Sequence, residues 1–194
     1  LYTNNSDAQH MYIAKAKEKG YEVLVLDSPI ISHVIQKLES KLENTSFVRV
    51  DSDTIDNLIK QDSSIESVLS EKDQKKMKEL FEKALPEKGF VVSFDALSPE
   101  SFPISITQSE FMRRMKEMSM TGGGGMMGMG NMPDSYNLVI NSNHPLINKI
   151  SSLKGKKKST LISRTINLAL LSQNLLKGEA LTKYIETSFD DLEA

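Results

Sequence analysis

The chain has 194 residues, of which 26% are charged and 39% are hydrophobic, and its formal net charge is −2. The absence of cysteine excludes a disulfide framework, a cysteine-based metal site and a cysteine nucleophile. The near-neutral balance argues against nucleic-acid binding through bulk charge. No apolar run approaches the ~18 residues that a membrane span needs, and the length suits one large domain or two small ones.

The first part of the chain alternates helical and strand patterns. A helix is expected from about residue 7 to Gly20, a typical C-terminal stop. The apolar run 23–26 predicts a strand covered on both faces. A second helix is expected to open near Pro29, and a short strand is expected over 47–50. This alternation predicts an α/β layer unit with a mainly parallel sheet.

The middle of the chain begins with a Ser- and Asp-rich stretch, 51–70, that is typical of a linker or a short helical connection. The elements expected after it are a charged helix over 71–85, strands over 90–94, 104–106 and 136–140, and a helix over 109–120 followed by a Gly/Met loop. The predicted class is therefore α/β (α+β over the whole chain). A small α/β layer subdomain precedes a mixed α/β domain that ends in a helical hairpin.

The last third is predicted to be helical. Asn143 is expected to cap a helix, with Pro145 in its first turn. The apolar stripe over 160–177 is too wide for a helix that rests on one neighbour. Gly178 is expected to interrupt it as a C-cap or a tight turn, and a further helix over 179–192 would complete an αα-hairpin. Because the chain starts at Leu1 and residues 1–3 resemble the end of a strand, we expect it to be part of a longer protein.

The apolar faces of the terminal helices allow two interpretations. They complete the core of this chain, or they pair with the same helices of a second copy in a two-fold four-helix bundle. The second interpretation makes the chain a homodimer. Its candidate dimerisation residues are Ile166, Leu168, Leu171, Leu175, Leu176, Leu181, Tyr184, Ile185, Phe189 and Leu192.

Methionine is concentrated in one segment, because eight of the ten methionines lie between Met112 and Met132. The helix there has an apolar face and a charged face that carries Glu110, Arg113, Arg114, Lys116 and Glu117. It is either an ordinary core helix or an adaptable surface that binds other polypeptides, a use for which flexible, polarizable methionine is well suited. The candidate client-binding residues are Phe111, Met112, Met115, Met118 and Met120.

No catalytic constellation is found. Residues 123–128 match G-x-G-x-x-G but lack the preceding strand and following helix of a dinucleotide site, which favours a flexible linker. His10, His33 and His144 lack metal-ligand spacing, and the basic run 154–158 has no interleaved aromatic residues. Asp51, Asp53 and Asp56 do not fit an EF-hand loop. The chain is thus expected to be a non-enzymatic binding or assembly module without metal or cofactor. The alternative is a small-molecule-binding α/β regulatory domain with a helical dimeriser.

Four motifs, taken in order, resemble a known family. Residues 19–24 (Lys-Gly-Tyr-Glu-Val-Leu) resemble a K-G-x-E-V-L strand entry, and residues 141–146 (Asn-Ser-Asn-His-Pro-Leu) resemble an N-x-x-H-P-L helix start. Residues 112–115 are similar to an amphipathic M-x-R-M helix, and residues 168–176 to a first dimerisation helix. Over nearly its whole length, the chain resembles the C-terminal part of the ninety-kilodalton heat-shock protein chaperones, particularly the bacterial form.

The resemblance implies a domain division. Residues 1–65 would be the last α/β subdomain of the chaperone middle region, and 70–194 the C-terminal dimerisation domain. Within the latter, 109–133 would be the Met-rich helix and loop, and 160–194 the dimerisation helices.

The resemblance also implies a cytoplasmic, homodimeric, ATP-driven chaperone that binds unfolded or partly folded client proteins, without nucleic acid or membrane partners. The family's ATP and Mg sites and its catalytic arginine would lie outside this chain. The chain departs from the family at 28–31, where many members are acidic, and in its longer glycine-rich loop. It also lacks the M-E-E-V-D tail, so tetratricopeptide co-chaperones are not implied.

Overall fold

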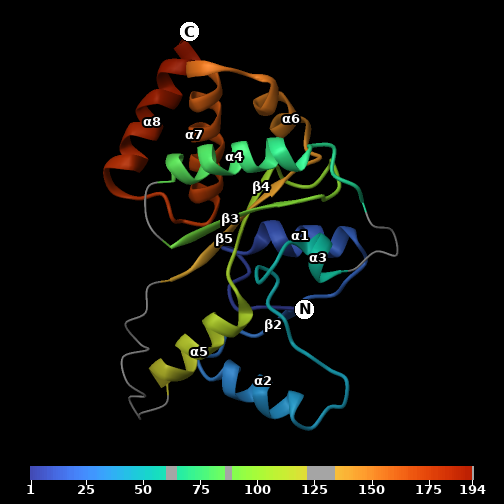
Figure 1. Cartoon of the computed structure of the whole chain (residues 1–194). Coiled ribbons are helices and arrows are strands. Elements are labelled where there is room, and N and C mark those ends of the chain that lie inside the picture. The colour runs from blue at the N-terminus through green and yellow to red at the C-terminus, as the bar shows by residue number, and fades with distance from the viewer. Residues whose placement is uncertain (60–64, 86–88, 122–133, 194) are drawn as a thin grey trace. The chain divides into compact units, whose positions relative to one another are not determined.

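The computed structural model describes residues 1–59, 65–85, 89–121 and 134–193 (Figure 1). These residues form eight helices and two small sheets, which confirms the α/β class. The chain divides into two compact units, one built from Leu1–Gln61 with Thr107–Tyr136 and the other from Asp62–Ile106 with Asn137–Ala194. The break after Gln61 falls inside the expected connection 51–70. Residues 107–136 group with the first unit, although the predicted domain ranges assigned 109–133 to the second.

The first unit is built on short parallel strands. β1 pairs in parallel with β2, with Tyr2 opposite Leu24, and an isolated parallel bridge joins Tyr2 to Arg49. The parallel arrangement is therefore as predicted. The elements of this unit are β1 (Tyr2–Thr3), α1 (His10–Glu18), β2 (Leu24–Val25), α2 (Ile31–Glu39), α3 (Ile55–Leu58) and α5 (Glu110–Thr121).

The end of α1 follows the sequence signal closely. Gly20 takes a left-handed φ of +79°, which a residue without Cβ adopts at little cost. The Gly20 N–H donates to the Lys17 carbonyl at 2.9 Å, and the Tyr21 N–H donates to the Ala16 carbonyl at 3.0 Å. This pair of bonds is the Schellman ending of a helix. The core beneath it gathers Tyr12, Ala16, Val50, Ile55 and Ile59.

Two strand predictions in this unit are corrected. The strand expected over 23–26 is limited to Leu24–Val25, and both side chains are exposed rather than covered on both faces. The strand expected over 47–50 is reduced to the bridge at Arg49, although the Tyr2 N–H donates to the Val48 carbonyl and the Val50 N–H to the Tyr2 carbonyl. The apolar run correctly indicated a strand. Its composition did not indicate whether other elements of the described chain cover the faces of that strand.

The second unit has helices packed beside a three-stranded sheet of order β3-β5-β4. Helix α4 packs against β3 and α7, and the rings of Phe81 and Phe94 meet edge to face at 6.4 Å. Ser70 caps α4 by accepting the Asp73 N–H. The elements are α4 (Glu71–Ala84), β3 (Phe90–Asp95), β4 (Ile104–Thr107), β5 (Tyr136–Asn141), α6 (Pro145–Ser152), α7 (Gly155–Ser172) and α8 (Gly178–Glu193). They lie close to the predicted ranges, except that α7 begins and ends five residues before the expected 160–177.

The segment before α6 has a different role from the one predicted. His144, not Asn143, is the N-cap of α6, and its Nδ1 accepts the Leu146 N–H at 3.0 Å. Pro145 lies in the first turn as expected. The buried Asn143 amide instead joins separate segments of the unit. It donates to the carbonyls of Glu66 and Leu97 and accepts the Val68 N–H at 2.8 Å.

The terminal hairpin forms as predicted, but its turn lies elsewhere. α7 ends at Ser172, and Asn174 takes the left-handed φ of +55°. The Asn174 N–H donates to the Leu171 carbonyl and the Leu175 N–H to the Leu170 carbonyl, which is again a Schellman ending. Gly178 does not cap α7; it takes a left-handed φ of +58° in the turn at the start of α8. Asparagine tolerates the left-handed region because of its short polar side chain, so it replaces glycine here.

The Asn143 amide gives a stability prediction for the second unit. Asn143→Ala leaves the part-buried Val68 N–H and two carbonyls without their partner, so we expect the free energy of unfolding to fall by about 1 to 3 kcal/mol. Urea denaturation followed by circular dichroism measures this. Asn148→Ala is the matched control, because the Asn148 amide reaches only the Asn143 carbonyl, at 3.5 Å. Equal losses in the two variants would contradict the bridging role.

Candidate functional site

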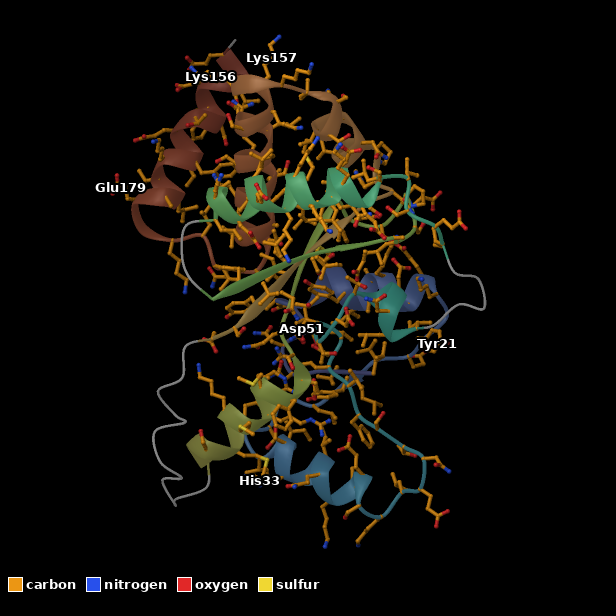
Figure 2. All side chains as sticks on the ribbon, viewed as in Figure 1. Tyr21, His33, Asp51, Lys156, Lys157 and Glu179 are labelled. Carbon is orange, nitrogen blue, oxygen red and sulfur yellow. The ribbon has the colours of Figure 1, made fainter. Side chains whose placement is uncertain are left out.

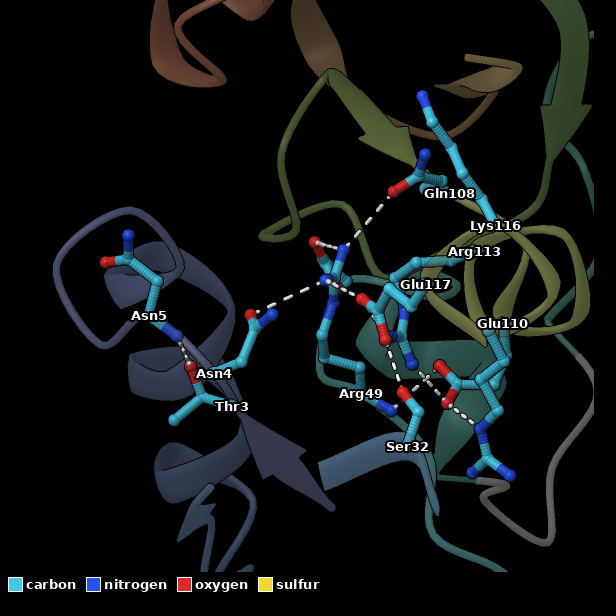
Figure 3. A network of polar contacts seen from close by, with 12 residues as sticks. Thr3, Asn4, Asn5, Ser32, Arg49, Gln108, Glu110, Arg113, Lys116 and Glu117 are labelled. Atoms are coloured by element: carbon cyan, nitrogen blue, oxygen red, sulfur yellow. Dashed lines mark hydrogen bonds and ion pairs between the residues drawn. The ribbon is translucent and has the colours of Figure 1, made fainter. Parts of the chain in front are cut away.

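Helix α5 contacts the other elements of the first unit through its charged side (Figure 3). Glu110 lies in its first turn, where a negative charge suits the helix dipole. Glu110 pairs with Arg113 at 2.5 Å and with Arg114 at 2.6 Å, and Arg113 pairs with Glu117 at 2.6 Å. These i,i+3 and i,i+4 pairs lie within α5 and place its charged groups along one side of the helix.

Arg113 is the buried centre of this side, with 4% of the residue exposed. Its Nη2 donates to the Tyr2 hydroxyl, which in turn donates to Glu110 at 3.1 Å. The guanidinium carbon also lies 5.7 Å from the centre of the Tyr2 ring, within cation–π range. Because Tyr2 belongs to β1, this triangle joins α5 directly to the parallel sheet.

Arg114 and Glu117 contact helix α2, and Arg114 also contacts the segment that follows α2 in the chain. Arg114 forms a two-pronged pair with Glu39, at 2.7 and 3.1 Å, and also donates to the Phe47 carbonyl. Glu117 accepts the hydroxyl of the buried Ser32. Bidentate arginine–carboxylate pairs fix orientation as well as distance. The two ends of the charged side are thus both held to α2.

Arg49 connects the sheet to the chain before α5. Its guanidinium pairs with Asp51 at 2.5 and 2.8 Å and lies 3.4 Å from oxygens of Asn4 and Gln108. The Arg49 N–H donates to Glu110 at 3.2 Å. Both Arg49 and Asp51 are buried, and buried charges are tolerated when they are paired and hydrogen-bonded. In this cluster the buried guanidinium and carboxylate are thus paired with each other and with further polar groups.

The ionisation of the network reflects burial and pairing. Burial raises the pKa of Tyr2 to about 12. The hydrogen bond from Arg114 lowers the pKa of Glu39 below its ordinary value. For Glu117, burial raises the pKa, but the bonds from Ser32 and Arg113 outweigh it, so the net pKa is lowered. The Glu39 and Glu117 carboxylates therefore stay charged and the Tyr2 phenol stays neutral over the physiological range.

The predicted client-binding residues lie on the remaining surface of α5. Phe111 is 67% exposed, and Met112, Met115 and Met118 are half-buried. The side chain of Met120 and the Gly/Met loop over 122–133 lie outside the described residues. The sequence left open which side of the helix packs inward, and the charged side is the one that contacts α2 and Tyr2 of β1. Only the i,i+3 and i,i+4 charge pattern pointed toward this network.

The predicted dimerisation residues divide into two groups. Ile166 and Leu176 are buried within the unit, whereas Leu175, Leu181 and Tyr184 are half-buried. The others are exposed. They are Leu168 (55%) and Leu171 (42%) on α7, and Ile185 (45%), Phe189 (62%) and Leu192 (83%) on α8.

Helix α8 has no buried residue among those described, although it packs along α7. An ion pair between Arg164 and Asp191 at 2.6 Å joins the two helices. Ile185, Phe189 and Leu192 recur at i, i+4 and i+7, which places them on one helix face. We call Leu168, Leu171, Ile185, Phe189 and Leu192 the exposed hairpin stripe.

The remaining candidates include two histidines and lysines of the basic run 154–158. His33 is exposed on α2, and Lys156 and Lys157 are exposed at the start of α7 (Figure 2). Burial lowers the pKa of His144, whose ring caps α6. In the described part of the chain, no three His, Asp or Glu side chains are grouped to hold a metal. No described helix has the length and apolar character needed to cross a bilayer.

Known proteins are similar to this chain over most of its length. The model of the Hsp90 protein family matches residues 3–183. A protein from Porphyromonas gingivalis strain ATCC 33277 named chaperone protein HtpG is 45% identical over 168 residues, covering 85% of this chain and 24% of the relative.

Two further relatives carry the same name. The protein from Bacteroides fragilis strain 638R is 42% identical over 166 residues, covering 84% of this chain and 24% of the relative. The protein from Bacteroides thetaiotaomicron is 34% identical over 259 aligned residues, covering 98% of this chain and 38% of the relative. The chain therefore spans between 24% and 38% of the length of these relatives.

The lowered pKa values predict how the attachment of α5 depends on pH. Since Glu39 and Glu117 have lower pKa values in the folded chain than the ordinary 4.5, their charged forms stabilise the fold above that pH. The stabilisation is lost as the pH falls through the folded values. We expect the urea midpoint of the first unit to fall on acidification in this range. Glu39→Gln with Glu117→Gln should flatten the pH profile, and an unchanged profile would contradict this assignment.

Proposed function

The chain belongs to the Hsp90 protein family, and on this premise we propose that it is the region of an ATP-dependent molecular chaperone that joins two protomers and contacts client proteins. In this proposal residues 1–65 are the last α/β subdomain of the middle region, and 70–194 are the C-terminal dimerisation domain. ATP and Mg binding and hydrolysis belong to regions outside the chain, so the chain itself is non-catalytic. The chaperone acts in the cytoplasm.

The exposed hairpin stripe is the observation that carries the dimerisation proposal. Helix α8 buries no residue within this chain, yet three large apolar side chains lie on one of its faces. A surface helix normally directs such a face toward a core. A second copy of the hairpin, related by a two-fold axis, covers the stripe with its own equivalent and completes a four-helix bundle.

The apolar side of α5 supports the client-binding proposal. The charged side of the helix is occupied by ion pairs, so Phe111 and the partly exposed methionines are presented away from the network. Methionine adapts its shape to different partners, which suits a surface that must accept many non-native sequences. Binding there depends on displaced water and side-chain plasticity, without a fixed hydrogen-bond code.

These two surfaces combine into a mechanism. A permanent joint at the terminal hairpins raises the effective concentration of the remaining domains of the two protomers for each other. Their ATP-dependent association then requires little intrinsic affinity. Clients that contact α5 are held between protomers that stay linked through each opening and closing.

Phe189→Asp tests the joint. A charge buried at the two-fold contact should weaken dimerisation by about 2 kcal/mol or more, because hot-spot aromatic contacts lie in fully desolvated pockets. Analytical ultracentrifugation across micromolar concentrations measures the dissociation constant. Thr187→Asp adds the same charge at an exposed position of α8 outside the stripe and should leave the dimer intact. A monomeric wild-type chain would overturn the dimerisation proposal.

Met112→Ser with Met115→Ser tests client contact. The two polar side chains reduce the adaptable apolar surface of α5, so the chain should protect an aggregating client less well in a light-scattering assay. Sedimentation should show an unchanged dimer. Lys116→Ser is the control, because it changes the same helix at a charged position. Protection equal to that of the wild type in the double variant would remove α5 from the client surface.

A further inference from the structure

Strand β2 has a free edge within the first unit. The Leu24 N–H donates to the Leu1 carbonyl at 3.1 Å, and the Leu26 N–H donates to the Thr3 carbonyl at 2.8 Å. Because backbone groups alternate in direction along a strand, the N–H of Val25 is directed toward the opposite edge. Among the described residues, the sheet holds only β1 beside β2, so no strand occupies that edge.

The two side chains of β2 are each more than half exposed in the described part of the chain. Leu24 is 51% exposed and Val25 is 60% exposed, although successive side chains of a strand lie on opposite faces of the sheet. Tyr21, just before the strand, is 47% exposed (Figure 2). Proteins usually protect such edges with lysine, proline or a bulge. Residues 23–26 contain neither lysine nor proline, so this edge lacks those two protections.

Acidic side chains frame this apolar edge. Glu22 precedes the strand and Asp27 follows it, and both are exposed. Neither forms a salt bridge with another described residue. A ligand that complements the edge is therefore apolar in the middle and positively charged at its ends, and it presents free backbone donors and acceptors.

We propose that the free edge of β2 binds an extended apolar polypeptide segment flanked by Lys or Arg, which adds to the sheet as a further strand. Backbone hydrogen bonds to Val25 supply binding that is independent of sequence, and Glu22 and Asp27 select the basic flanks. This inference rests on the proposed chaperone function and names a substrate class for it: extended stretches of non-native chains. With only two strand residues, the site makes few hydrogen bonds and releases its ligand readily.

The test uses the whole 194-residue chain and a fluorescent peptide of alternating valine and threonine with lysine pairs at both ends. Fluorescence anisotropy measures its affinity, and hydrogen exchange measures protection of the Val25 amide. Val25→Pro removes the edge N–H without touching the bonds to β1, and should weaken binding about tenfold. Glu22→Lys with Asp27→Lys should reverse the preference in favour of a glutamate-flanked peptide.

Peptide chemistry provides a readout that does not depend on folding of a variant. A peptide N-methylated along one edge loses its backbone donors and should bind the wild-type chain about tenfold more weakly. Equal binding of the N-methylated and parent peptides, or no binding of the parent peptide, would overturn the proposal. Val68→Ser, at a 70% exposed apolar position outside the α5 surface and the exposed hairpin stripe, should leave peptide affinity unchanged. Failure at β2 is therefore distinguishable from failure of client protection or dimerisation, which are measured separately.

Discussion

The attachment of α5 by its charged side is the constraint on which the functional surface of the first unit depends. Arg113 and Arg114 tie the helix to Tyr2 of β1, to Glu39 of α2 and to the Phe47 carbonyl. Removing one partner of a buried ion pair leaves an uncompensated charge, so such pairs specify a single geometry more than they add stability. The charged side of α5 makes these contacts, and Phe111, on the apolar side of the helix, is exposed.

The same principle, a polar group that satisfies several backbone partners, organises the second unit. Asn143 joins residues 66–68 to the segment after β3, and Asn141 accepts the Leu97 N–H and donates to the Ser98 carbonyl. In the motif at 141–146, the buried Asn141 and Asn143 therefore join separate backbone segments, and His144 caps the helix that follows. The apolar contribution comes from α4 and α7, which pack together and leave α8 as an outer layer with an uncovered face.

Much of this arrangement follows from sequence pattern. Helix periodicity located α4, α5, α7 and α8, and the alternation in the first part correctly indicated a parallel sheet. The errors have physical causes. Asn174 replaces the expected glycine at the end of α7, and His144 takes the capping role assigned to Asn143, because several polar residues can satisfy the same backbone groups.

The candidate site was harder to predict. Periodicity identified both sides of α5, but which side contacts the first unit depends on tertiary partners such as Tyr2 and Glu39, which lie far away in sequence. The same limit applies to the hairpin, where Ile166 and Leu176 belong to the core and Phe189 does not. The sequence pattern of a helix does not show whether its apolar side chains pack within the same chain or against a second chain.

Hydrogen exchange of α5 in an Arg113→Met variant tests the central claim most directly, since methionine keeps much of the side-chain volume and removes the charge. Loss of a buried paired charge should make the α5 amides exchange about a hundredfold faster. Amides of α4 and α7 should keep their wild-type rates, because those helices belong to the other unit. Unchanged protection of α5, or equal loss in all three helices, would contradict the account.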